Sequence, residues 1–280
     1  MKASSQGRVR PRFGQHFLQN AAIIEKILDA LGAREGETVV EIGPGKGALT
    51  RPLLDRGLRV LAFEIDPKLA TDLLLELEER TFFLKRLDVL KADMGAALEE
   101  IGAAPPVPLV GNLPYESATP MLRSFVRRPD LFSRIVAMVQ KEVADRITSP
   151  PGGDAYGFLT VDIGAFATAR KLFDVGRGNF VPPPQVQSTV IELVPRQPAE
   201  GTEAALKVAS AGFTSRRKTL VNALSPLWGK DRAREAVEQV GWPFTVRAET
   251  LGLDEFRALV PHLGAPGRSQ AQPEASAEDA

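Results

Sequence analysis

The sequence predicts an α/β protein with a mostly parallel sheet, followed by a small all-helical domain. Over residues 21–197, short and nearly all-apolar runs alternate with segments of helical pattern. Such alternation is typical of parallel strands that are buried on both faces and connected by helices. A polar, Pro-containing stretch at 195–201 ends the alternation, and only helical patterns follow it.

The first helix of the α/β part is expected at 21–31. Asn20 is placed to cap it, its apolar residues repeat at helical spacing, and Gly32 follows its end. The apolar runs then predict strands at 38–42, 59–65, 82–87, 107–111 and 134–140. Helices are expected between them at 48–56, 67–80 and 120–127, and from Lys141 onward.

The pattern changes after Pro150. A loop at 150–154, an apolar segment at 156–167 and a strand at 169–174 precede a strand with partial alternation at 186–194, which predicts an antiparallel edge on the sheet. Three helices are expected at 203–223, 231–240 and 253–259. The predicted organisation is a basic N-terminal arm (1–20), an α/β domain (21–197), a helical domain (198–263) and a disordered tail (264–280), because the tail lacks large apolar residues.

Composition excludes several kinds of site. The 280 residues include 35 basic and 35 acidic side chains, so the overall charge is no argument for a nucleic-acid partner. The absence of cysteine excludes disulfides, thiol catalysis and thiolate metal sites, and His16 and His262 are too far apart in sequence to suggest a multi-histidine metal site. No apolar run approaches the roughly 20 residues of a membrane span and no signal peptide is evident. We therefore expect a soluble, cytoplasmic protein that uses no metal.

A glycine loop follows the strand predicted at 38–42. It reads Gly43-Pro44-Gly45-Lys46-Gly47, which lacks both the dinucleotide pattern G-x-G-x-x-G and the P-loop G-K-[ST]. A G-x-G-x-G loop after the first strand is instead typical of S-adenosylmethionine enzymes, with Gly43 and Gly45 passing close to the ligand. Glu64 ends the next strand, 21 residues after Gly43, where an acid can accept hydrogen bonds from both ribose hydroxyls. A tight structural turn and a solvated carboxylate are the alternatives.

Two aspartates compete for the cofactor's adenine. Asp88 and Asp93 both follow apolar runs, and either carboxylate could accept from the exocyclic amine of adenine. We favour Asp88 because it lies closer to the predicted strand end. Asp66 is expected to cap the helix that begins at Pro67.

The fourth predicted strand ends in Asn112-Leu113-Pro114-Tyr115, similar to the N-P-P-Y motif of amino-methyltransferases. An adenine amine is a poor nucleophile because its lone pair is delocalised. If the Asn112 amide oxygen and a backbone carbonyl (Leu113 or Pro114) accept its two hydrogens, the nitrogen can turn its lone pair toward a sulfonium methyl. Tyr115 would stack on the base, and Phe180 is our candidate for the base's opposite face, although a core position for Phe180 remains open.

Five ordered motifs give the chain a resemblance that covers roughly residues 8–262. They are Gly14-Gln15-His16-Phe17-Leu18, the loop with Glu41-Ile42 before it and Leu49-Thr50 after it, Asn112–Tyr115, Phe180-x-Pro182-x-Pro184-x-Val186-x-Ser188 and Arg216-Arg217-Lys218-Thr219-Leu220. Together they resemble the small-subunit (16S) rRNA adenine dimethyltransferases, the KsgA/RsmA family. The resemblance implies dimethylation of two adjacent adenosines in the 3′-terminal hairpin of 16S rRNA, with S-adenosylmethionine as methyl donor, on a maturing small ribosomal subunit.

The resemblance also assigns residues. It implies that His16, Leu18, Gly43, Glu64, Asp88 and Asn112 contact the cofactor, which gives Asn112 a double role. The family usually has asparagine at the position of His16. His16 is therefore the one implied cofactor contact whose residue type departs from the family pattern. The implied catalytic domain is 21–197, and the implied RNA-binding domain is 198–263.

RNA contact is expected at Arg216, Arg217 and Lys218, because residues 201–247 hold eight basic and four acidic residues. An ordinary basic helix face is the alternative. For the whole chain, a 23S rRNA adenine methyltransferase, a DNA adenine methylase and a non-catalytic ribosome-assembly factor remain open, and a monomer is expected.

Overall fold

The computed structural model describes residues 16–77, 81–215 and 218–266. The described residues divide into two compact units: unit 1 is bounded by 1–148 and 166–197, and unit 2 by 149–165 and 198–280. Unit 1 ends at Gln197, where the sequence analysis places the end of the α/β domain, but residues 149–165 cluster with unit 2 and not with the α/β unit. The reason is local bonding, since the Tyr156 hydroxyl donates to the Leu251 carbonyl at 2.6 Å and the Gly152 N–H donates to the Glu249 carbonyl at 2.7 Å.

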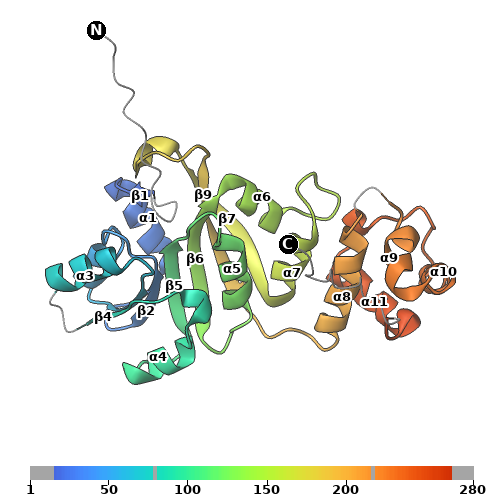
Figure 1. Cartoon of the computed structure of the whole chain (residues 1–280), viewed down its shortest axis with the longest axis horizontal. Helices are drawn as coiled ribbons and strands as arrows, with labels where there is room; N and C mark the ends of the chain where they lie inside the picture. Colours follow the sequence, from blue (N-terminus) through green and yellow to red (C-terminus); the bar gives the residue numbers. More distant parts are fainter. Residues whose placement is uncertain (1–15, 78–80, 216–217, 267–280) are drawn as a thin grey trace, which may run out of the picture. The chain divides into compact units, whose positions relative to one another are not determined.

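Unit 1 contains a seven-stranded sheet of order β4-β3-β2-β5-β6-β9-β7 (Figure 1). Its strands are β2 (Thr38–Ile42), β3 (Arg59–Phe63), β4 (Phe82–Lys85), β5 (Val107–Asn112), β6 (Phe132–Gln140), β7 (Ala167–Val175) and β9 (Ser188–Pro195). The pairs among β2 to β6 are parallel, whereas β9 is antiparallel to both β6 and β7. The predicted parallel sheet with an antiparallel edge is confirmed.

The helices of unit 1 are α1 (Ala21–Leu31), α2 (Thr50–Asp55), α3 (Pro67–Glu76), α4 (Met94–Glu100), α5 (Ala118–Val126) and α6 (Lys141–Thr148), with 3-10 turns η2 (Val89–Lys91) and η3 (Arg177–Asn179). Asn20 and Asp66 cap α1 and α3 through their side chains, as predicted. Helix α4 was not predicted, because only Asp93 marks its start and Gly95 weakens its pattern.

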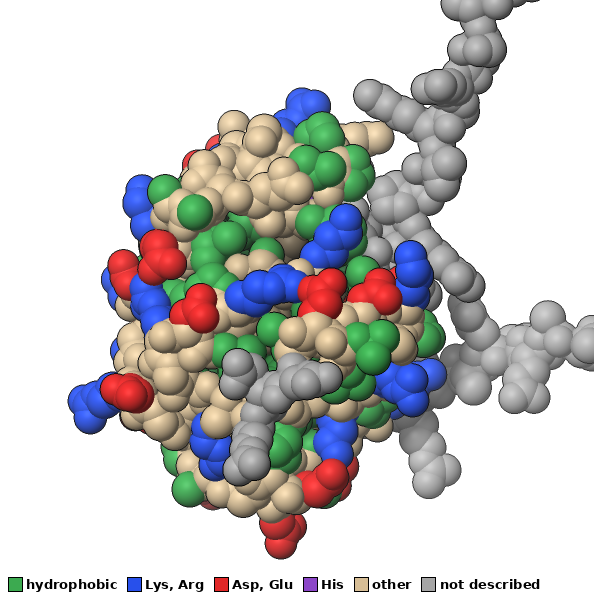
Figure 2. All heavy atoms as spheres, turned by 90° about the vertical axis from the view of Figure 1, so that its left-hand side faces the viewer, with side chains coloured by type: hydrophobic (Ala, Val, Ile, Leu, Met, Phe, Trp, Pro, Cys, Tyr) green, Lys and Arg blue, Asp and Glu red, His purple; other side chains and the backbone are tan. Residues whose placement is uncertain are grey.

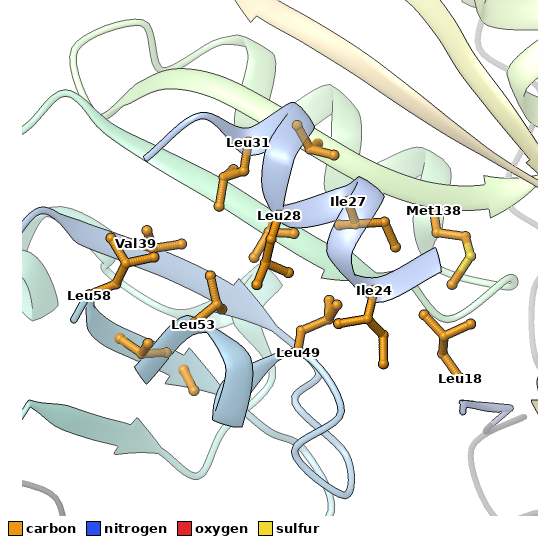
Figure 3. Close-up of a cluster of buried hydrophobic side chains, with 14 of the residues drawn as sticks. Leu18, Ile24, Ile27, Leu28, Leu31, Val39, Leu49, Leu53, Leu58 and Met138 are labelled. Atoms are coloured by element: carbon orange, nitrogen blue, oxygen red, sulfur yellow. The ribbon is translucent and has the colours of Figure 1, made fainter. Parts of the chain in front are cut away.

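One cluster of core residues in unit 1 lies between one face of the sheet and the helices α1, α2 and α3 (Figure 3). Leu28 and Leu31 of α1 and Leu53 of α2 pack with Val39 of β2 in one buried cluster. Alternate residues of β2, such as Val40, are fully buried as well, so both faces of the sheet are covered. This burial explains the nearly continuous apolar strands.

A two-stranded sheet lies apart from the large one. β1 (Phe17–Leu18) pairs antiparallel with β8 (Phe180–Val181), with Phe17 opposite Val181 and Leu18 opposite Phe180. Strands this short carry no periodic signal, so neither was predicted.

Unit 2 is helical: α7 (Phe158–Phe166, whose last residue belongs to unit 1), α8 (Thr202–Phe213), α9 (Leu220–Trp228), α10 (Lys230–Gln239), η4 (Ala248–Thr250) and α11 (Leu253–Leu263). The single helix predicted at 203–223 is wrong, because α8 ends at Phe213 and the Leu220 N–H donates to the Val246 carbonyl at 2.8 Å instead of continuing a helix. The predicted disordered tail lies outside the described residues from 267 onward.

Candidate functional site

A cavity of about 1100 Å³ lies at the carboxyl ends of β2 and β5. These two neighbours are the point where the sheet order changes direction, which is where ligands bind in open α/β sheets. The lining of the cavity comes from unit 1 and contains two groups of residues, all of them predicted site residues except Glu41. We name Glu41, Gly43, Gly45, Glu64 and Asp88 the glycine-loop wall, and Asn112, Leu113, Pro114 and Tyr115 the β5 wall. The cleft that the predicted chemistry requires is therefore present.

The glycine loop needs its glycines. Gly43 and Gly45 have φ values of 66° and 58°, in the left-handed region that side chains disfavour. The Gly43 N–H donates to the Phe63 carbonyl at 2.9 Å, which ties the loop to β3. A Cβ on Gly45 would lie 3.1 Å from the Phe17 ring, so the missing side chain also lets β1 pack closely on the loop.

Glu64 is only 3% exposed and its carboxylate is fixed by backbone donors. Oε2 accepts from the Gly45 N–H at 3.0 Å and Oε1 accepts from the Asp66 N–H at 2.9 Å. Burial raises the pKa of Glu64, and these hydrogen bonds oppose the rise. Each oxygen keeps a lone pair for a further donor, so the orientation suits a diol such as a ribose.

Glu41 is a member of the cavity lining that the sequence analysis did not single out as a site residue. It lies within β2, is 1% exposed, and burial raises its pKa to about 8, with the neighbouring Glu64 adding to the rise. Within the described part of the chain, its Oε2 has no hydrogen-bond partner. A buried, unsatisfied acceptor beside a cavity is suited to a donor from a ligand. The signal in the sequence was an acid inside an otherwise apolar strand.

The structure separates the two competing aspartates. Asp88 lines the cavity while its Oδ1 accepts from the Leu90 N–H at 3.0 Å. Asp93 does not line the cavity, and its Oδ1 caps α4 through the Ala96 N–H, also at 3.0 Å. Only Asp88 is placed to bind a ligand in this cavity.

The β5 wall presents acceptors where the strand ends. Asn112 donates from Nδ2 to the His16 carbonyl at 2.8 Å. The Pro114 carbonyl accepts from the Ser117 N–H at 3.1 Å, which favours the Leu113 carbonyl as the second acceptor for a target amine. The Tyr115 hydroxyl lies 2.8 Å from Ser188 Oγ, and burial raises the pKa of Tyr115.

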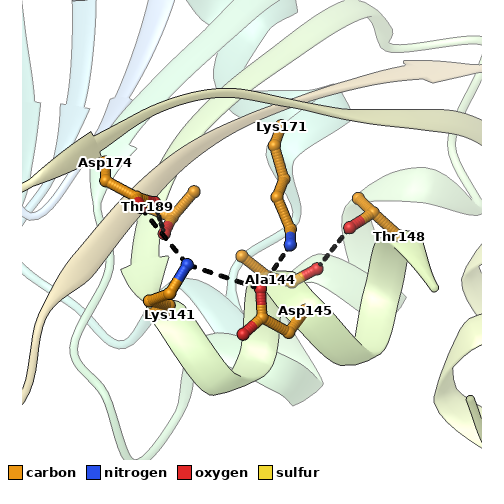
Figure 4. Close-up of polar contacts among 7 residues, drawn as sticks. All are labelled: Lys141, Ala144, Asp145, Thr148, Lys171, Asp174 and Thr189. Atoms are coloured by element: carbon orange, nitrogen blue, oxygen red, sulfur yellow. Dashed lines mark hydrogen bonds and ion pairs between the residues drawn. The ribbon is translucent and has the colours of Figure 1, made fainter. Parts of the chain in front are cut away.

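Ser188 begins β9, and a polar network holds the next residue of that strand, Thr189 (Figure 4). Thr189 donates to Asp174 Oδ1 at 2.6 Å, and Lys141 Nζ donates to Asp174 Oδ2 at 3.2 Å. The Thr189 hydrogen bond is the main cause of the lowered pKa of Asp174. The network fixes the strand that carries the hydroxyl partner of Tyr115.

Phe180 corrects one prediction. It is 2% exposed, belongs to the core cluster with Leu18 and Met138, and is absent from the cavity lining. Pairing of β8 with β1 turns its side chain into the core, so the interpretation of Phe180 as the second stacking face for a base is wrong. Leu18 lines the cavity but is only 4% exposed, and His16 lines it with a half-buried side chain.

The predicted basic run is described only in part. Lys218 is exposed in the connection between α8 and α9, whereas Arg216 and Arg217, like the basic N-terminal arm up to residue 15, lie outside the described residues. On the α3 side of the molecule, Lys and Arg side chains are interleaved with Asp and Glu (Figure 2). Among the described residues we find no cluster of three potential metal ligands and no helix long and apolar enough to cross a bilayer.

Comparison with known proteins extends these observations. The family model described as "Ribosomal RNA adenine dimethylase" matches residues 6–253. The chain is 39% identical over 268 residues to "Ribosomal RNA small subunit methyltransferase A" of Streptococcus pneumoniae, covering 91% of this chain and 92% of that protein. It is also 39% identical over 261 residues to the protein of the same name from Thermosynechococcus vestitus, covering 90% of this chain and 96% of that protein.

Solved structures share the fold. A dimethyladenosine transferase from Plasmodium falciparum superposes with a TM-score of 0.69 at 23% identity, covering 87% of this chain and 96% of that one. The 23S rRNA methyltransferase ErmE superposes with a TM-score of 0.67 at 25% identity, covering 88% of this chain and 99% of that one. With a family match over most of its length and relatives well above 30% identity, the chain belongs to the ribosomal RNA adenine dimethylase family.

Proposed function

We propose that this protein dimethylates the exocyclic amines of two adjacent adenosines in the 3′-terminal hairpin of 16S rRNA, during assembly of the small ribosomal subunit. One observation supports this most strongly. The Asn112–Tyr115 segment lines the same cavity as the glycine loop, Glu64 and Asp88, so acceptors for a target amine and a fitting cofactor site share one space. We further propose that the protein acts as a monomer in the cytoplasm.

The glycine-loop wall fits S-adenosylmethionine, which supplies an electrophilic methyl group on a sulfonium when it is bound. Glu64 would accept from the ribose hydroxyls with the lone pairs that Gly45 and Asp66 leave free. Asp88 would use Oδ2 for the adenine amine, because its Oδ1 is occupied by Leu90. The ammonium of the amino-acid end would lower the pKa of Glu41 again and pair with its carboxylate through the orphaned Oε2. Leu18 of β1 and His16, which precedes β1, would cover the site.

The β5 wall would position the target base. Asn112 Oδ1 and the Leu113 carbonyl would accept the two amine hydrogens, which draws the nitrogen toward tetrahedral geometry and frees its lone pair. Tyr115, oriented by Ser188, would stack on the extruded base. No strong base is required, because the amine becomes acidic only as the new N–C bond forms and its proton then passes to solvent. Positioning and hydrogen bonding supply the catalysis.

Unit 2 would bind RNA, with Lys218 together with Arg216 and Arg217 contacting phosphates. Such contacts position the RNA without reading its sequence. Catalysis and RNA contact would then be divided between the two units.

The test is methyl transfer from labelled S-adenosylmethionine to ribosomal subunits from a strain that lacks this modification. We expect label in the small subunit, and mass mapping should place two methyl groups on each of two adjacent adenosines. Label confined to the large subunit would instead support a 23S rRNA methyltransferase. No label in either subunit, with intact binding of the small subunit, would support a non-catalytic assembly factor.

A further inference from the structure

His16 makes three contacts with residues that line the cavity, and two of them reach the β5 wall that we assign to the target base. Its carbonyl accepts from Asn112 Nδ2 at 2.8 Å. Its ring lies 5.6 Å from the Tyr115 ring, centroid to centroid, at an interplanar angle of 31°. Its Nδ1 lies 2.8 Å from the carbonyl of Pro182, which follows β8.

We propose that His16 is a positioning residue for the target adenine, acting through Asn112, Tyr115 and the segment that contains Pro182. The proposal rests on the proposed function, but it gives His16 a role beyond the cofactor contact that the family resemblance implies.

The backbone contact determines which way the Asn112 carboxamide faces. A carbonyl can only accept, so the NH₂ group of Asn112 must turn toward His16. The opposite orientation would bring two acceptor oxygens together. Oδ1 therefore faces away from His16 and is available to a target amine. This is the orientation that the proposed mechanism requires, and it exists before the base arrives.

The imidazole contributes two further constraints. Because the Pro182 carbonyl is an acceptor, Nδ1 carries the hydrogen and donates it, which fixes the ring. The fixed ring packs on Tyr115, while Ser188 holds the Tyr115 hydroxyl. Tyr115 is thus backed on the side of His16, so a base would stack on the other face of its ring.

Two substitutions separate these constraints. His16→Asn places an amide nitrogen near the position of Nδ1 but removes the ring that backs Tyr115. His16→Phe keeps a ring of similar size but removes the donor to Pro182. His16→Ala removes both, and all three keep the backbone carbonyl that orients Asn112. His262→Asn, which changes the chain's other histidine on the exposed side of α11, is the matched control.

We would measure the single-turnover rate of methyl transfer to small subunits lacking the modification, the Kd for S-adenosylmethionine, and the melting temperature of each variant. We expect His16→Asn and His16→Phe each to lower the rate about three- to tenfold, and His16→Ala by roughly the product of the two, from the usual contributions of one aromatic contact and one hydrogen bond. The cofactor Kd should change less than threefold, and His262→Asn should match the wild type.

The outcomes are distinguishable. If the wild type does not methylate the small subunit, the proposed function is wrong. If the wild type is active and the His16 variants are equally fast, the positioning role is wrong. A weakened cofactor Kd with an unchanged rate would also overturn it and make His16 a cofactor contact only. A variant that melts lower is compared at a temperature where it is fully folded, so that loss of fold does not count as loss of rate.

Discussion

The two walls of the cavity are built in different ways. The glycine-loop wall follows the ends of three successive parallel strands, from Gly43 to Asp88, and each strand end is marked in the sequence. The β5 wall depends on His16 and the segment around Pro182, which are separated by 166 positions and are brought together by the pairing of β1 with β8. The sequence located the members of both walls, but it did not locate the contact of His16 with Pro182, because long-range strand pairing creates that contact.

The largest effect is expected in the β5 wall. Asn112→Ala should lower the single-turnover rate of methyl transfer about 10³-fold, because it removes an acceptor that acts on the amine in the transition state. RNA binding should be preserved, since Asn112 contributes to orientation and not to phosphate contact. Rapid-quench transfer and filter binding of small subunits would measure the two quantities.

This variant also sharpens the comparison between the walls. Its cofactor Kd should change by a smaller factor than its rate, although Asn112 lies beside the cofactor site. A near-normal rate would remove Asn112 from the mechanism. A cofactor Kd that rises as much as the rate falls would show that the two walls do not act separately.

A smaller effect is expected from Glu41 in the glycine-loop wall, and it concerns stability. Its pKa of about 8 in the folded protein lies above the ordinary value of 4.5, so the unfolded state loses this proton first as pH rises. The unfolded state is then favoured, and folding stability falls between about pH 4.5 and 8. Glu41→Gln removes this loss and should stabilise the cofactor-free protein at pH 7 by roughly 2–3 kcal/mol.

Denaturant unfolding of both proteins at pH 5 and pH 8 measures this effect. The two should be similar at pH 5 and should diverge at pH 8, whereas Glu99→Gln, which removes an exposed carboxylate of α4, should follow the wild type. Cofactor affinity should fall in Glu41→Gln, because glutamine cannot lose a proton to pair with the ammonium as Glu41 can. Parallel stability curves for Glu41→Gln and wild type would mean that Glu41 is not held at a raised pKa.

The sequence was sufficient for the sheet, its antiparallel edge and most strand positions, because buried parallel strands are nearly all apolar. It was insufficient where tertiary contacts decide. Residues 149–165 join unit 2 through Tyr156 and Gly152, and the helix predicted at 203–223 is interrupted because Leu220 bonds to Val246. Phe180 was assigned to the base site because its neighbours belong to a motif, whereas its pairing with Leu18 makes it a core residue.

The smallest effect distinguishes Asp88 from Asp93, and it tests whether the glycine-loop wall follows the strand ends. Each aspartate accepts one backbone N–H at 3.0 Å at the start of a short helical segment, so alanine at either position loses one cap, worth about 1 kcal/mol of stability. Of the two, only Asp88 lines the cavity. Asp88→Ala should therefore raise the cofactor Kd about tenfold, the usual loss for one hydrogen bond to a charged acceptor, while Asp93→Ala leaves it unchanged. Calorimetric titration of S-adenosylmethionine into both variants measures the difference. Because the two lose the same cap, equal affinities would mean that the cofactor's adenine is held by some other group, and that the end of β4 does not mark its site.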